Sequence, residues 1–314
     1  MTLEGSKNPD FQQSASQDFS VGASGLASRT FSLWIRRLGS YIVIVGLVGA
    51  VLALWNTYVA TIIAPLDPES FLNLISTDPL DIILKSLNWT STSGVPVFVI
   101  IIALSLIGMI INSVTHGAAI KLCLEDYGNR GAGTIRESFS YAGNRLTTLI
   151  GAQIIYGLIL MIPVLPGGLV FAYSALTIDI MDPSTYGLLL TTIPLLLIGL
   201  IIALYLAVRL APTIAVVIAE KERSAVDSVK RAWSITGHHF WHIFAGLFLL
   251  IVLIAVASIL IAMLIAPIAL IAVSIIGLST IIIEILISPL PAVFQAVLYR
   301  DLESRARMVE ADWW

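Results

Sequence analysis

The sequence predicts an all-α polytopic membrane protein, with six transmembrane helices in three hairpins and amphipathic interfacial helices at the cytoplasmic surface. Three observations lead to this fold class: the composition, the lengths of the apolar runs and the placement of the basic residues. Hydrophobic residues make up 58% of the 314-residue chain and charged residues 12%, with a mean hydropathy of +0.95. Because soluble domains carry roughly 25% charged residues, we expect lipid to be the solvent around most of this chain.

The apolar runs predict six membrane spans. Each run reaches the roughly 20 residues that a helix needs to cross the hydrocarbon core. The last two runs are separated only by Ala266-Pro267, and we divide them there because basic residues lie at both outer ends. The predicted spans cover residues 41–63, 95–120, 146–175, 186–219, 241–266 and 268–298.

Basic residues predict the orientation. Sixteen of the 17 Lys and Arg residues lie on one side of this map, and Lys85 alone lies on the other. Because basic residues are retained on the cytoplasmic side, we expect a multi-pass cell-membrane protein with both termini in the cytoplasm. Residues 1–25 are polar and are predicted to be a disordered tail. Residues 26–305 form the transmembrane domain, and 306–314 a short cytoplasmic tail.

The connections on the exterior side differ in length. The first, residues 64–94, contains Asp67-Pro68 and Asp78-Pro79, and each pair is typical of a helix start. We therefore expect two short helices on the outer surface. Asn88 begins a glycosylation sequon in this connection, and the third-to-fourth connection is acidic, with Asp179 and Asp182.

Three cytoplasmic segments align on an aromatic-Ser pair, which indicates an internal repeat of residues 26–125, 134–220 and 228–301. The alternative is that aromatic and basic residues simply mark any membrane interface. Each aligned segment precedes an outbound span, and each return span ends in an acidic residue. The pairs are Phe31-Ser32, Phe139-Ser140 and Trp233-Ser234, and the acidic ends are Glu125, Glu220 and Asp301.

The second and third of these segments have helical amphipathic periodicity. Thr134 with Glu137 forms a capping box, and Ser224 with Asp227 resembles one. In the second segment the apolar face is Ile135, Phe139 and Ala142. In the third it is Ala225, Val226, Val229, Ala232 and Trp233, opposite Asp227, Lys230, Arg231 and Ser234.

Short basic helices with an aromatic residue on the apolar face are typical of the headgroup plane. The expected lipid contacts are Arg136, Arg145, Lys230, Arg231, Trp233 and Trp241.

Two charged residues, Arg209 and Glu284, fall inside predicted spans. Such residues cost about 2.5–3.5 kcal/mol each at the centre of a span and usually have a defined role. One interpretation is a buried ion pair between them, or Arg209 extending to the headgroups. The other is a proton or substrate site built on Glu284. The remaining polar groups at membrane depth are expected to make hydrogen bonds between helices; they are Asn112, His116, Gln153 and Gln295.

No cofactor or metal site is predicted. His238 and His242 are one helical turn apart, a spacing that can bind metal, and His239 lies between them. No carboxylate or cysteine lies within ten residues of them, so these histidines are expected to be ordinary interfacial residues. Cys123 is the single cysteine, which excludes a disulfide within the chain.

Residues Arg209 to Glu220, Ala225 to Ile243 and Ala296 to Leu302 carry a recognisable pattern, with Pro212 in the first stretch and Tyr299 and Asp301 in the last. These stretches resemble the membrane domain of the glycerophosphoryl diester phosphodiesterase superfamily. In some relatives this domain precedes a soluble phosphodiesterase domain. No such domain follows Asp301 in this sequence, so the resemblance implies the membrane domain and not the catalytic activity.

The sequence therefore favours a non-enzymatic membrane protein, a scaffold or module that contacts membrane lipids and a cytosolic or membrane protein. The alternatives are a small-solute transporter that uses Glu284, and a lipid-handling enzyme suggested by the family name alone. No feature indicates nucleic-acid binding.

The predicted orientation can be tested by cysteine accessibility in a Cys123→Ser background. We expect Lys85→Cys and Ile180→Cys to react with an impermeant maleimide from outside intact cells. Arg130→Cys and Ala225→Cys should react only after permeabilisation, because they follow the basic side of the map. Labelling of position 130 or 225 in intact cells would contradict the map.

Overall fold

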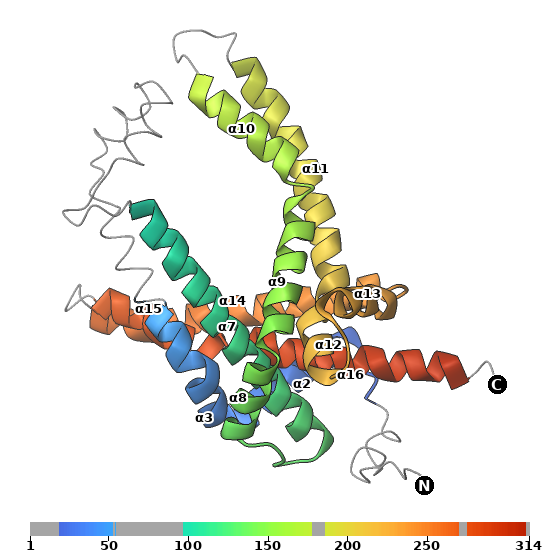
Figure 1. Cartoon of the computed structure of the whole chain (residues 1–314). Coiled ribbons are helices and arrows are strands. Elements are labelled where there is room, and N and C mark those ends of the chain that lie inside the picture. Colours follow the sequence, from blue (N-terminus) through green and yellow to red (C-terminus); the bar gives the residue numbers. More distant parts are fainter. Residues whose placement is uncertain (1–18, 53, 55–96, 178–185, 270–274, 312–314) are drawn as a thin grey trace.

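The computed structural model describes residues 19–52, 54, 97–177, 186–269 and 275–311, and these residues form helices and short connections without any β-strand. The all-α class is therefore confirmed (Figure 1). The predicted outer helices with Asn88, and the connection with Asp179 and Asp182, lie outside the described residues.

Four helical stretches are long and apolar enough to cross a membrane. The first lies in α7 (Val97–Gly128) and the third in α14 (Phe240–Ala269). The other two are broken helices: α11 (Tyr186–Leu210) with α12 (Thr213–Ala219), and α15 (Ile275–Ile287) with α16 (Leu290–Ala311).

Two further stretches are sharply bent helix pairs. Helix α2 (Ala23–Arg36) meets the helical stretch Leu38–Leu52 at 86°, and α8 (Ile135–Asn144) meets α9 (Leu146–Met161) at 69°. An amphipathic helix followed by an apolar one at a steep angle is the geometry of a helix that lies in the headgroup plane before the chain enters the bilayer. Counting each pair as one span raises the number of spans from four to six.

Prolines account for the breaks within the spans. Pro163 separates α9 from α10 (Leu165–Thr177), Pro212 separates α11 from α12, and Pro289 separates α15 from α16. Proline lacks the N–H that a helix interior needs, and its ring clashes with the carbonyl one turn earlier. The long apolar run is divided into two helices as predicted, but the division lies after Ala269 and not at Pro267, because α14 continues through this proline. The missing N–H of Pro267 interrupts the hydrogen bonding of only one turn near the end of α14, which a membrane helix tolerates.

The core lies where the return helices α7, α12 and α16 pack against one another. Small and β-branched side chains allow this close approach, as is usual between membrane helices. The residues with no exposed surface are Ala118, Ala119, Ile120, Leu122, Cys123, Ala215, Val216, Val217, Ala292, Val293, Ala296, Val297 and Leu298.

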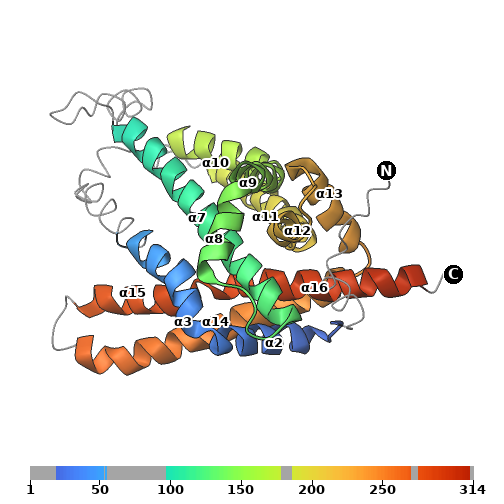
Figure 2. The same ribbon diagram turned by 60° about the horizontal axis from the view of Figure 1, so that its bottom comes forward.

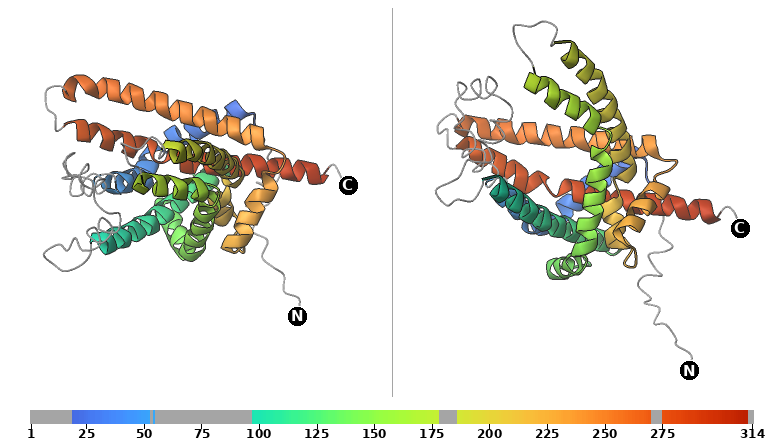
Figure 3. Two further views of the ribbon diagram at one scale, coloured as in Figure 1. Left: turned by 90° about the horizontal axis from the view of Figure 1, so that it is seen from above. Right: turned by 45° about the horizontal axis from the view of Figure 1, so that its top comes forward.

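Away from this core the hairpins diverge. The pair α10–α11 leaves the core in a different direction from the pair α14–α15, as Figure 1 and the right view of Figure 3 show. Large apolar side chains such as Leu190, Ile201 and Leu264 are more than 60% exposed there. Exposed aliphatic surface of this kind is what a helix presents to lipid.

The amphipathic helices α2, α8 and α13 (Ala225–Ile235) form a layer on one side of the core, which we call the cap. Helix α8 packs on α7, α13 packs on α9 and α12, and α2 packs on α14 and α16 (Figure 2). Helices α8 and α13 therefore each cover the hairpin that precedes them in the sequence, and α2 covers the third hairpin. The residues directly before the aligned aromatic-Ser pairs, Thr30, Ser138 and Ala232, are all fully buried.

The cap helices begin as predicted. Thr134 Oγ accepts a hydrogen bond from the Glu137 N–H at 3.2 Å, and Ser224 Oγ accepts one from the Asp227 N–H at 3.2 Å. Each bond satisfies a backbone N–H that the first turn leaves free.

The faces of the cap helices are only partly as predicted. In α8 the apolar face turns inward, and in α13 the buried face is Ser228, Val229, Ala232 and Ile235. Val226 and Trp233, also on the predicted apolar face, are exposed. The reason is that α13 has apolar side chains on two sides, and only one of them meets protein.

The terminal segments are more ordered than predicted. Phe19 and Val21 pack against the rest of the chain and α2 begins at Ala23, so the disordered tail does not reach residue 25. Helix α16 continues to Ala311, beyond the predicted end of the domain at residue 305. Figure 3 shows this helix projecting past the core.

One close helix contact involves η2 (Ile42–Gly46), a π-helical turn at the start of the first hairpin. A Cβ at Gly46 would collide with the carbonyl oxygen of Ile285 in α15. We therefore expect Gly46→Ala to force the two helices apart and to lower stability by about 1–3 kcal/mol, as overpacking does. Thermal unfolding in detergent measures this change. The matched control is Gly157→Ala in α9, where a Cβ meets nothing within 4 Å; equal effects of both changes would contradict the close contact.

Candidate functional site

Three carboxylates at the ends of the return helices organise the cap. They are Asp126 at the end of α7, Glu220 after α12 and Asp301 in α16. The alignment of the internal repeats predicts Glu125 as the acidic residue that ends the first return span. The residue that joins α7 to the cap is instead its neighbour Asp126. Glu125 instead pairs with Lys121, one turn earlier in α7, at 2.6 Å.

Asp126 connects α7 to the bend after α2. Its buried carboxylate lies 3.4 Å from the Arg36 guanidinium and 3.1 Å from the Arg37 guanidinium, and it accepts a hydrogen bond from the Gly131 N–H at 2.9 Å. Arg37 also donates to the Gly133 carbonyl at 3.0 Å. Gly131 and Gly133 have φ values of +83° and +84°, in the left-handed region that favours glycine.

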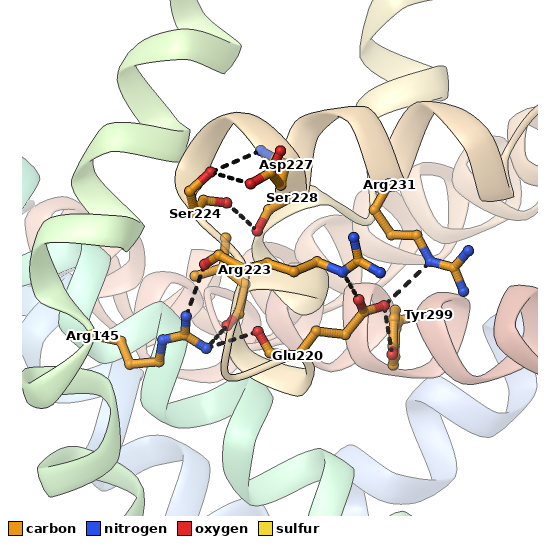
Figure 4. A network of polar contacts seen from close by, with 9 residues as sticks. Arg145, Glu220, Arg223, Ser224, Asp227, Ser228, Arg231 and Tyr299 are labelled. Atoms are coloured by element: carbon orange, nitrogen blue, oxygen red, sulfur yellow. Dashed lines mark hydrogen bonds and ion pairs between the residues drawn. The ribbon is translucent and has the colours of Figure 1, made fainter.

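Glu220 is the centre of a polar network at the start of α13, which Figure 4 shows. Its carboxylate forms an ion pair with Arg223 and a second one with Arg231 at 3.4 Å, and the Tyr299 hydroxyl of α16 donates to it at 3.4 Å. The network therefore joins α12, α13 and α16.

Arg145 caps the end of α12 from the neighbouring helix pair. Its guanidinium donates to the carbonyl oxygens of Val217 at 2.8 Å, Glu220 at 2.9 Å and Arg223 at 3.1 Å (Figure 4). A cation at a helix C-terminus satisfies carbonyls that lack intrahelical donors and complements the helix dipole. The fork of N–H groups in arginine can serve several carbonyls at once.

Asp301 joins the two ends of the chain. It has no exposed surface and accepts hydrogen bonds from the Val21 N–H at 2.7 Å and from Arg305 Nε at 3.1 Å, and its carboxylate lies 2.9 Å from His242 Nε2. Arg305 also donates to the Val21 carbonyl at 2.6 Å. This carboxylate therefore holds the segment before α2 against α14 and α16.

The histidines do not act as a group. His242 contacts Asp301, whereas His238 is exposed. Burial, and then the nearby positive charge of Arg305, lower the pKa of His239. Across the described ranges, no three His, Cys, Asp or Glu side chains lie close enough together to hold a metal ion.

The structure does not bring Arg209 and Glu284 together, and no ion pair joins these two described residues. Arg209 donates to the carbonyl oxygens of Gly237 at 2.7 Å, Trp233 at 3.1 Å and Thr236 at 3.3 Å. It thus caps the end of α13, and its guanidinium carbon lies 4.1 Å from the centroid of the Trp233 ring. The predicted ion pair is replaced by these helix-terminal carbonyls, which offer the cation a nearer partner.

Glu284 lies in a different part of the fold. A Cβ at Gly49 would be 3.3 Å from Glu284 Oε1 and 3.2 Å from the Ser288 hydroxyl oxygen. This carboxylate therefore faces the glycine surface of the first hairpin.

The structure also separates the predicted lipid contacts into two sets. Arg145 and Arg231 are partly buried and have protein partners, so their contact with lipid stays a prediction. Arg136, Lys230, Trp233 and Trp241 are exposed. Among the polar groups at membrane depth, Gln153 accepts a hydrogen bond from the Ser113 hydroxyl at 2.7 Å, which links α7 and α9 as expected.

Comparisons of this chain with protein-family models, with curated proteins and with solved structures found no match. The functional argument therefore depends on the geometry of the cap and of the spans.

The roles of Arg209 and Glu284 can be separated by a double-mutant cycle. We expect Arg209→Gln to lower stability by about 1.5–3 kcal/mol, because it removes charged hydrogen bonds to three carbonyls. Because Arg209 and Glu284 share no partner, the effect of Glu284→Gln should add to it within about 0.5 kcal/mol. Thermal unfolding of the single and double variants in detergent measures both values, with the exposed Arg136→Gln as control. A coupling above 1 kcal/mol would restore the ion-pair interpretation.

Proposed function

We propose that this chain is a non-enzymatic integral membrane scaffold, with six spans and both termini in the cytoplasm, whose cap presents a fixed surface to lipid headgroups and to a protein partner. The observation that carries the proposal is the use of the charged groups. Asp126, Glu220 and Asp301 are each held by at least two basic side chains, which is the arrangement of structural connections. Positively charged and aromatic side chains remain on the outer side of the cap.

The resemblance to the glycerophosphoryl diester phosphodiesterase membrane domain fits this proposal. The residues that carry the resemblance have structural roles: Pro212 breaks a span, and Glu220, Tyr299 and Asp301 join cap helices to return helices. A pattern made of such residues describes a fold and not a reaction. We therefore assign the chain to the membrane-domain type without assigning it a phosphodiesterase activity.

A second candidate function is small-solute transport through Glu284. The observation in its favour is that this carboxylate lies beside Ser288 and Gly49, next to the broken helix pair α15–α16, without an ion pair to a described residue. Carboxylates at membrane depth frequently take part in proton relays. The family name alone suggests the third candidate, a lipid-handling enzyme.

The scaffold can be tested by site-specific photo-crosslinking in native membranes. We expect a crosslinker at Arg136 or Lys230 in the cap to give a discrete protein adduct, because both positions are exposed. The matched control is Ile251, which is 62% exposed on the apolar part of α14 and should give lipid adducts only.

Proton uptake by proteoliposomes distinguishes the transporter. If proton uptake depends on a solute and is abolished by Glu284→Gln, the transporter would replace the scaffold as the proposed function. The scaffold proposal would also fail if photo-crosslinking gave no protein adduct specific to the cap positions.

A further inference from the structure

Six aromatic side chains of α11, α13 and α14 form a continuous series, which we call the aromatic ladder. Phe240 and Phe244 are nearly parallel, with ring centroids 6.0 Å apart, and Phe244 and Phe248 follow at 6.5 Å. The Tyr205 ring contacts those of Phe240 at 5.1 Å and Trp233 at 6.3 Å. The members are Tyr205, Trp233, Phe240, Trp241, Phe244 and Phe248.

The ladder lies on the surface and extends from the cap along a membrane span. Trp241 is 76% exposed and Phe248 is 57% exposed. Phe240, Phe244 and Phe248 follow one another at four-residue intervals, so the ladder rises about 12 Å along α14. One end is therefore beside the cap and the other is at the depth of the acyl chains.

Basic groups gather at the cap end. Lys230 is exposed one turn before Trp233 in α13, so the two side chains are neighbours on the helix surface. Arg209 lies against the Trp233 ring, and its Nε is buried without a hydrogen-bond partner. His238 is exposed in the short connection between α13 and α14.

The nearest acidic groups have partners within the protein. The Asp227 carboxylate accepts a hydrogen bond from the Ser224 hydroxyl at 2.6 Å, and Glu220 pairs with Arg223 and Arg231. The Ser224 hydroxyl is neutral, so Asp227 keeps its charge. Lys230 and the Arg209 beside Trp233 outnumber this carboxylate, which suits the surface to an anion. Because Arg209 already occupies the face of Trp233, the ladder is not suited to a cationic headgroup.

We propose that the aromatic ladder binds one anionic phospholipid, with its phosphate at Lys230 and Trp233 and an acyl chain along Phe244 and Phe248. This inference rests on the proposed scaffold and names the lipid class that one part of its surface selects. Tyrosine and tryptophan are enriched at the level of the headgroups, where their rings have both apolar and polar contacts. A basic side chain beside them adds attraction to anionic lipid.

Native mass spectrometry of the full chain in detergent tests the site. Phosphatidylglycerol and phosphatidylcholine with identical acyl chains are the probes. We expect the first phosphatidylglycerol to bind at least fivefold more tightly than phosphatidylcholine. Lys230→Gln should weaken that first binding about fivefold, the effect of one basic residue at an anionic surface. Phe248→Ala should weaken both lipids, because it removes contact with the acyl chain.

The matched control is Arg136→Gln, which removes an equally exposed charge from α8, a helix that contributes nothing to the ladder. It should leave the first binding event unchanged. Equal losses for Arg136→Gln and Lys230→Gln would overturn the site and leave the scaffold standing, because the attraction would then be diffuse. Equal affinities for the two lipids in the parent chain would also overturn it. Photo-crosslinking detects the protein partner of the cap independently of lipid binding. Failure of the scaffold proposal can therefore be distinguished from failure of the lipid site.

Discussion

The burial of the Asp126 and Asp301 carboxylates, on the return helices α7 and α16, is the constraint on which the cap depends. A charge that leaves water costs several kcal/mol unless it is paired and hydrogen-bonded. Asp126 and Asp301 are almost completely buried, and both are surrounded by guanidinium groups and backbone N–H groups. Asp126 is held by Arg36 and Arg37 at the bend where α2 ends, so it fixes the entrance of the first hairpin. Asp301 instead holds the segment before α2, through Val21, against the last hairpin.

Arginine provides the complementary half of this arrangement. Arg145 and Arg209 both direct their guanidinium groups at carbonyl oxygens that end a short helix. Such carbonyls have no intrahelical donors and, near a membrane, limited access to water. These helices end where the chain turns after α12 and after α13, and each of the two ends takes its donor from a residue outside that helix.

Part of this structure could be predicted from the sequence. Hydropathy and the basic-residue asymmetry predict the all-α class, and the capping sequences at Thr134 and Ser224 predict two helix starts. The partner of Arg209 could not be predicted, because the end of α13 reaches it only through tertiary packing. The carbonyl partners of Arg145 and the exposure of Val226 depend in the same way on which neighbouring hairpin each cap helix covers. Periodicity shows that a helix has an apolar side, but it does not show whether protein or lipid meets that side.

The contact between Val21 and Asp301 has a consequence for how the chain assembles. These residues are 280 positions apart, so α2 waits for its surface on α14 and α16 until almost the whole chain has been synthesised. Contacts of such high sequence separation close late, because the entropy of a long loop is lost before any stabilisation is gained. During membrane insertion the first amphipathic helix therefore has only its contacts with α7, such as Arg36 with Asp126, until the third hairpin arrives, and the headgroup layer can cover its other face in the meantime.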